Sequence, residues 1–151
     1  MYKRILLATD ETRESLIALR EGALMARDYG AAVYLLVVVT HSVGALMADS
    51  IHPTSPTSNG KPLLEAGLDR LGRLGLTATG AVVTGEPPQQ IGAAAARFNA
   101  DLVIVGHRRQ NLLDRWWSGA SGGYIADYVT CSVLVARNCV SDEDFERLLA
   151  P

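Results

Sequence analysis

The sequence predicts an α/β fold built on an open sheet of five parallel strands. Short, continuously apolar runs alternate with segments that repeat apolar residues at helical spacing, and the alternation occurs four times before a last strand. Continuous apolar runs are typical of strands covered on both faces. Alternating strands and helices favour a parallel sheet with right-handed crossovers. We therefore expect a Rossmann-like architecture with the strand order 3-2-1-4-5 and helices on both faces.

The first two strands are predicted from their apolar runs. Residues 5–9 (ILLAT) form the first. The helix that follows has Glu11 and Glu14 in its first turn, where negative charge suits the helix dipole, and Gly30 as its expected C-cap. Residues 33–39 (VYLLVVV) give the strongest strand signal in the chain and are expected to form a central strand.

A polar connection interrupts the middle of the chain. From about residue 40 to residue 61 the sequence is rich in Pro, Ser, Thr and Gly, so we expect a mobile segment or a lid there. Pro62 suits the first turn of the second helix, which is expected to end near Gly75. Residues 77–84 are expected to form the third strand, before the turn Gly85–Pro88.

The second half supplies two more helices and two more strands. The third helix is predicted from apolar residues at helical spacing, namely Ile91, Ala94, Ala95 and Phe98. Residues 101–106 form the fourth strand, which ends in a glycine and leads into an Arg-rich loop. A fourth helix is expected from Ser118 to Val129, and the fifth strand is Ser132–Ala136. Cys131, which opens this strand, is expected to be a buried packing residue.

The predicted domain covers residues 1–137, and residues 138–151 are expected to form a C-terminal tail with a short helix. Ser141 and Asp144 have the spacing of a capping box. Phe145, Leu148 and Leu149 are expected to make the apolar face of this helix.

Composition excludes several classes of protein. The 151 residues are 48% hydrophobic with a formal net charge of −2, which excludes a disordered chain and argues against a general nucleic-acid binder. Cys131 and Cys139 form no disulfide framework and have no zinc-site spacing. No apolar run approaches the roughly 18 residues of a membrane span. We expect a soluble, cytoplasmic domain with neither nucleic acid nor membrane as a partner.

The ends of the predicted strands are the candidate ligand site, because parallel sheets bind ligands beyond the carboxyl ends of their strands at the switch point. Those ends are Thr9–Asp10, Val39–Thr40, Thr84–Gly85 and Gly106. Small residues at 118–123 (SGASGG) open the next helix, where backbone N–H groups and the helix dipole suit a phosphate.

Five segments together resemble the universal stress protein family over residues 1–137: ILLATDET, YLLVVV, GEPPQQI, ADLVIVGHRR and CSVLVAR. Nucleotide-binding members of that family carry Gly-x2-Gly-x9-Gly-Ser/Thr after the fourth strand. Gly106 matches the first glycine and Gly119 the third. Arg109 stands at the place of the second glycine, and Ala120 at the place of the hydroxyl residue.

The resemblance implies a small regulatory domain that binds ATP or AMP, with Mg²⁺, and that forms a homodimer through Ser132–Ala136. It implies that Ala8, Thr9 and Asp10 line the adenosine side, with Asp10 near the ribose or the metal. Val38 meets the adenine through its backbone, and Val105 and Gly106 lie under the ribose and phosphates. The residues implied at the phosphates are Gly119, Ala120, Ser121 and Gly122, with Arg108 and Arg109 as direct phosphate contacts.

The two departures from the motif favour an alternative. Arg109 lacks the conformational freedom of glycine, and Ala120 has no hydroxyl to give to a phosphate. The alternative is a dimer that does not bind nucleotide and acts through protein partners, by the 40–61 segment or residues 141–149. Asp10 has its own alternative as a helix cap. We expect no catalytic residue, because the chain has neither a nucleophile–base spacing nor a GxxxxGK[ST] loop, so at most slow nucleotide hydrolysis is left open.

Overall fold

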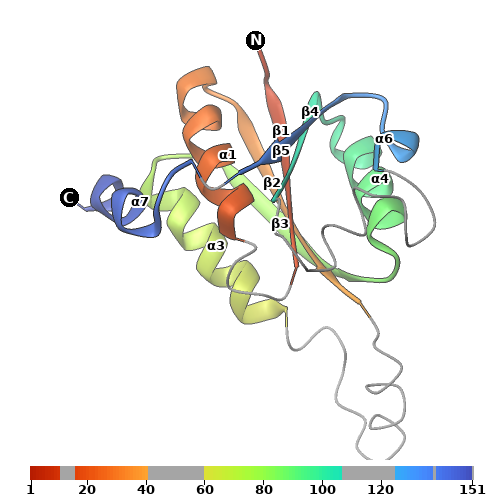
Figure 1. Cartoon of the computed structure of the whole chain (residues 1–151), viewed down its shortest axis with the longest axis horizontal. Helices are drawn as coiled ribbons and strands as arrows, with labels where there is room; N and C mark the ends of the chain where they lie inside the picture. The colour runs from red at the N-terminus through yellow and green to blue at the C-terminus, as the bar shows by residue number, and fades with distance from the viewer. Residues whose placement is uncertain (11–15, 41–59, 107–124, 138, 151) are drawn as a thin grey trace, which may run out of the picture.

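The computed structural model describes residues 1–10, 16–40, 60–106, 125–137 and 139–150 (Figure 1). The strands within these ranges are β1 (Arg4–Thr9), β2 (Ala32–Val39), β3 (Ala78–Thr84), β4 (Leu102–Gly106) and β5 (Ser132–Ala136). The helices are α1 (Leu16–Tyr29), α3 (Lys61–Arg73), α4 (Pro87–Phe98), α6 (Ile125–Tyr128) and α7 (Asp142–Leu149).

The strands form one sheet in the order β3-β2-β1-β4-β5, and every pair is parallel. This confirms the predicted sheet. The chain first builds outward from β1 through β2 to β3, and then crosses to the other side of β1 to add β4 and β5. Ala8 therefore pairs with Leu36 on one side and with Val105 on the other. The switch point lies between β1 and β4.

Two helical layers cover the sheet. α1, α3 and α7 lie on one face, and α4 and α6 on the other (Figure 1). Along β1, Ile5 and Leu7 join the first core cluster, whereas Leu6 and Ala8 join the second. All four are fully buried. Apolar residues on both sides of the strand are what the continuous apolar runs predicted.

Helix ends follow the local sequence. Gly30 has φ of +63°, and its N–H donates to the carbonyl of Arg27 at 3.2 Å, which confirms it as the C-cap of α1. Pro62 lies in the first turn of α3 as predicted. α4, which ends at Phe98, instead has Asn99 as its C-cap, in the left-handed conformation with φ of 52°. Asparagine tolerates this conformation better than other non-glycine residues.

The capping box is present in part at the start of α7. Ser141 Oγ accepts a hydrogen bond from the Asp144 N–H at 3.0 Å, as the spacing predicted. The Asp144 carboxylate accepts from Ser141 Oγ at 2.7 Å instead of from the backbone. Phe145 and Leu149 are buried in the same core cluster as α1 and α3. Leu148 is 46% exposed, so its placement on the buried face of this helix was wrong.

Three other expectations need adjustment. Phe98 is only partly buried: its ring centroid lies 5.2 Å from that of Tyr34, and the Arg4 guanidinium carbon lies 4.3 Å from the same ring. Cys131 is likewise only partly buried. The described part of the fourth helix, α6, ends at Tyr128, so Val129 lies beyond it. The residues from which its start was predicted lie outside the described ranges, as do 41–59 of the polar connection.

Candidate functional site

The predicted site residues of β1, β2 and β4 meet at one end of the sheet. Thr9 and Asp10 are each 4% exposed, Val38 is 1% exposed and Val105 is 3% exposed. Gly106, which ends β4, is also buried. Ala8 and Val105 are the last partners in register between β1 and β4, so Thr9 and Gly106 are the residues that follow this pair at the switch point. The sheet thus brings together the part of the predicted site that these three strands carry.

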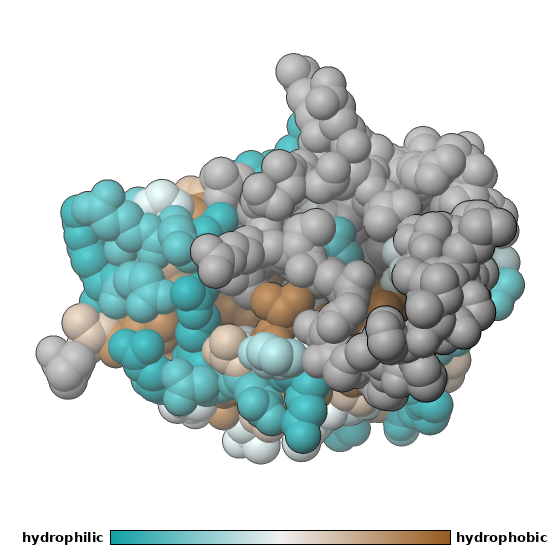
Figure 2. Space-filling model, turned by 90° about the horizontal axis from the view of Figure 1, so that it is seen from below, coloured by the Kyte–Doolittle hydropathy of each residue, from teal (hydrophilic) through white to brown (hydrophobic). Residues whose placement is uncertain are grey.

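Figure 2 looks onto this end of the molecule. Hydrophobic surface is visible near the middle of the view, and hydrophilic side chains gather on the side where α7 lies. Among the described residues at the strand ends, Ala8, Val38 and Val105 are buried and apolar, and Thr9 and Asp10 are buried and polar.

Thr9 acts within the sheet. Its hydroxyl donates to the carbonyl of Leu36 on β2 at 3.3 Å. The bond ties the end of β1 to its neighbour, and it directs the Thr9 side chain toward β2. A ligand at the switch point would therefore meet Thr9 mainly through its backbone.

Asp10 is a buried carboxylate among the residues that the structure describes. Burying a charged carboxylate costs free energy unless polar groups surround it. Its place directly after the central strand makes it the side chain best positioned to meet a polar ligand at the switch point. The interpretation of Asp10 as a helix cap depends on backbone N–H groups of residues 11–15, which lie outside the described ranges.

The predicted phosphate-facing residues Arg108, Arg109, Gly119, Ala120, Ser121 and Gly122 also lie outside the described ranges. The structure does position both ends of the segment that contains them. The segment leaves the sheet after Gly106 and returns at Ile125, which is 1% exposed. Ile125 packs in the same core cluster as Ala8, Val38 and Val105. The return point is thus on the α4 side of the same strands.

The turn after β3 borders this end of the sheet as well. The Gly85 N–H donates to the Val39 carbonyl at 3.1 Å, which joins the ends of β3 and β2. Gly85 has φ of +147°, a conformation that favours glycine. A Cβ added at Gly85 would lie only 2.8 Å from Nε2 of the Gln90 side chain. Gln90 was not singled out from the sequence. It lies in the first turn of α4, two residues after Pro88.

Two cavities lined by described residues lie away from the strand ends. One of about 260 Å³ lies between α4 and α6, next to Cys131, and one of about 340 Å³ lies where α1 and α3 lead into β2 and β3. Neither contains a predicted site residue. Within the described ranges, no three His, Cys, Asp or Glu side chains gather as a metal site would require. No described helix is long and apolar enough to cross a membrane.

The two thiols have raised pKa values for different reasons. Partial burial raises the pKa of Cys131. Cys139 is exposed, and a hydrogen bond to the Glu21 carboxylate, with the negative charge of that group, raises the pKa of its thiol. The backbone N–H of Cys139 also donates to Glu21 Oε1 at 3.1 Å.

A sequence model of the universal stress protein family matches residues 1–137 of this chain. The chain belongs to this family. It is 31% identical over 142 residues to the universal stress protein A homolog of Haemophilus ducreyi, which covers 89% of this chain and 96% of that protein. The resemblance inferred from the strand and turn motifs is thereby confirmed.

Solved structures of the family share this fold. The universal stress protein UspA of Lactobacillus plantarum superposes with a TM-score of 0.69 at 21% identity, covering 90% of this chain and 98% of that one. A universal stress protein family member of Arabidopsis thaliana, solved with AMP bound, gives a TM-score of 0.64 at 19% identity, covering 93% and 94%. The Rossmann-like sheet is therefore common to these proteins.

Proposed function

We propose that this universal stress protein is a small regulatory domain that binds an adenine nucleotide at the carboxyl ends of β1 and β4. The observation that carries the proposal is the buried carboxylate of Asp10, which directly follows β1, the strand that pairs with β4 at the switch point. Family membership supports it, as does the AMP bound to the Arabidopsis family member of the same fold.

The predicted site residues at the strand ends have the following roles in this proposal. Asp10 accepts hydrogen bonds from the ribose or holds Mg²⁺, for which a carboxylate oxygen is a suitable ligand. Ala8 and Val105 form an apolar floor, and the backbone of Val38 meets the adenine. Gly106 leaves room under the ribose and phosphates because it has no side chain. In this proposal the phosphates are bound by the motif residues between Gly106 and Ile125.

Arg109 and Ala120 favour the second candidate function, a stress-family dimer that acts through protein partners without nucleotide. In that case the buried strand ends have only a structural role and bind no nucleotide. The two candidates differ in one measurable property, which is affinity for AMP and ATP. Homodimerisation through β5 belongs to both candidates. The cytoplasmic location stays a prediction.

Calorimetric titration with AMP and ATP, with and without Mg²⁺, tests the proposal on the purified chain. We expect saturable binding, and Asp10→Ala should weaken it about tenfold to a hundredfold, because a hydrogen bond to a charged group contributes roughly 1.5–3 kcal/mol. Asp28→Asn is the matched control, since Asp28 is exposed at the far end of α1, and it should leave affinity unchanged.

Two results would contradict this function. Absence of heat at millimolar nucleotide would favour the partner-binding dimer. Equal affinity of the Asp10→Ala variant and the parent would remove Asp10 from the site. Gly119→Val adds a check on the motif itself, because a branched side chain should block backbone approach to the phosphates and abolish binding.

A further inference from the structure

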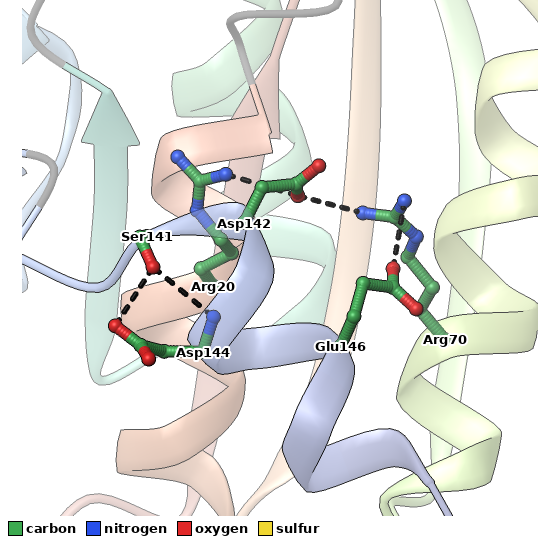
Figure 3. Close-up of polar contacts among 6 residues, drawn as sticks. All are labelled: Arg20, Arg70, Ser141, Asp142, Asp144 and Glu146. Carbon is green, nitrogen blue, oxygen red and sulfur yellow. Dashed lines mark hydrogen bonds and ion pairs between the residues drawn. The ribbon is translucent and has the colours of Figure 1, made fainter.

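The C-terminal helix α7 lies outside the matched family domain and connects two helices of that domain. The family match ends at residue 137, and α7 covers Asp142–Leu149. Figure 3 shows α7 lying across α1 and α3, with side chains reaching both. The helix is therefore an addition to the family domain that packs on its surface.

The apolar contacts of α7 are deep. Phe145 is fully buried and Leu149 is 5% exposed. Both belong to the core cluster that contains Leu19 of α1 and Leu71 of α3. An eight-residue helix is too short to be stable alone in water, so α7 is helical because it is docked. We therefore expect α7 to be helical when it is docked and to lose its helical structure when it is released.

Polar contacts link α7 to both helices. Asp142 Oδ1 lies 3.0 Å from Arg20 Nη1 on α1 and 3.5 Å from Arg70 Nη1 on α3 (Figure 3). Arg70 Nη2 lies 3.0 Å from Glu146 Oε1. The two arginine side chains are 10% and 23% exposed, whereas the Asp142 and Glu146 side chains are 60% and 41% exposed, so only the arginine side of each ion pair is shielded from water. Such pairs contribute more than exposed ones.

One carboxylate thus bridges α1 and α3. The helices also approach each other directly, since a Cβ at Gly67 of α3 would lie 3.1 Å from Leu19 Cδ1 of α1. α1 begins at Leu16, six residues after Asp10, and it is the helix that follows the central strand. Ile5 and Leu7 of β1 also belong to the core cluster that contains Leu19, Phe145 and Leu149, so β1 and the docking surface of α7 share one core.

We propose that α7 is a regulatory strap. Docked, it holds α1 against α3 and keeps the end of β1 in place for a ligand. Released, it leaves the family domain folded but loosens α1 and lowers ligand affinity. The strap itself is independent of the ligand's identity, whereas its coupling to affinity rests on the proposed nucleotide function.

Hydrogen exchange of the full chain, read by mass spectrometry, tests the strap. In Phe145→Ala we expect exchange over residues 142–149 to rise at least tenfold and exchange in α1 to rise several-fold, with β1 and β4 still protected. Asp142→Asn, which keeps the apolar anchor, should raise exchange in α7 several-fold. Leu148→Ala is the matched control, because Leu148 is exposed on the same helix, and it should change nothing.

Unchanged exchange in α7 of both test variants would overturn the strap. An equal rise in hydrogen exchange throughout the chain in both test variants would also overturn the strap, because α7 would then unfold together with the whole domain. The milder Asp142→Asn variant keeps the test decisive if Phe145→Ala does not fold.

Calorimetry with AMP then tests the coupling separately. We expect Phe145→Ala to bind AMP about tenfold more weakly than Leu148→Ala. Equal affinities would overturn the coupling. If the parent chain does not bind AMP, the proposed function and the coupling both fail, and the exchange data alone decide whether the strap exists.

Discussion

At the residue scale, the contact between Glu21 and Cys139 has a chemical consequence. The carboxylate raises the pKa of the thiol, so at a given pH below that value less thiolate is present and alkylation is slower. Glu21→Gln should lower the pKa and move the rate profile toward lower pH. We expect Cys139 to react with iodoacetamide several-fold faster in this variant at pH 8, measured by mass spectrometry.

The control for this effect is Asp28→Asn on the same helix, which should leave the rate unchanged because Asp28 pairs with Arg27 and lies away from Cys139. The slower reaction of Cys131, whose pKa is raised chiefly by burial, should respond to neither change. A Cys139 rate that is the same in Glu21→Gln and the parent would show that the carboxylate does not control the thiol.

Single residues also mark how far the sequence predicted the site. Asp10 was predicted because polar residues directly after a buried strand fall at the ligand-binding end of a parallel sheet, and the structure buries it there. The nearness of Gln90 to Gly85 could not be predicted, because the sequence does not show that Gly85 adopts φ of +147°. Leu148 was misplaced because an eight-residue helix gives too few turns to define its buried face.

At the scale of elements, α4 and α6 cross at Gly92. A Cβ there would lie 2.5 Å from the Tyr128 carbonyl oxygen and 2.8 Å from its Cβ. Backbone atoms cannot move aside as the end of a side chain does, so Gly92→Ala should push α6 away. Overpacking typically costs about 1–3 kcal/mol, which exceeds the roughly 0.5–1 kcal/mol that alanine gains over glycine in a helix. We expect a lower midpoint in urea unfolding.

Gly72→Ala is the matched control. Gly72 is exposed within α3, and nothing lies within 4 Å of the added Cβ, so this variant should be stabilised by about 0.5–1 kcal/mol. Opposite signs for the two glycines are the expected result. Stabilisation in both would mean that α6 yields freely to α4, and the close crossing would then have no energetic role.

The elements differ in how well the sequence predicts them. The strands were predicted to within a residue or two, because apolar side chains on both faces leave an unbroken signal, as in Arg4–Thr9 and Ala32–Val39. The described part of α6, Ile125–Tyr128, lies within the helix that was predicted from Ser118 to Val129 and ends one residue before its predicted end. Its packing against α4 is not encoded by local sequence.

At the scale of the whole molecule, the sheet has two edges, β3 and β5. The alternation of strands and helices predicted the sheet order. It did not predict that α7 packs over α1 and α3. That contact depends on side chains far apart in the chain, such as Arg20 and Asp142. Edge strands offer unpaired backbone groups to a second chain, so each edge is a potential site of association.

Of the two edges, β5 is the better suited to join two copies. Its central residues Val133, Leu134 and Val135 are apolar and only partly buried, so a second copy would cover them. β3 carries Gly80 in its interior, and glycine weakens a strand as a pairing surface. The family resemblance likewise implies a dimer through β5.

Light scattering over a concentration series tests this prediction with one lysine on each edge. Ser132 of β5 and Thr79 of β3 are both exposed. We expect the parent chain to be a dimer. Ser132→Lys should raise the dissociation constant of the dimer at least about tenfold, because a lysine that faces its own copy costs upward of about 1.4 kcal/mol. Thr79→Lys should leave the dissociation constant unchanged. A monomeric parent would refute the dimer. Dissociation by Thr79→Lys alone would move the interface to β3, because the charge would then act where the strands pair.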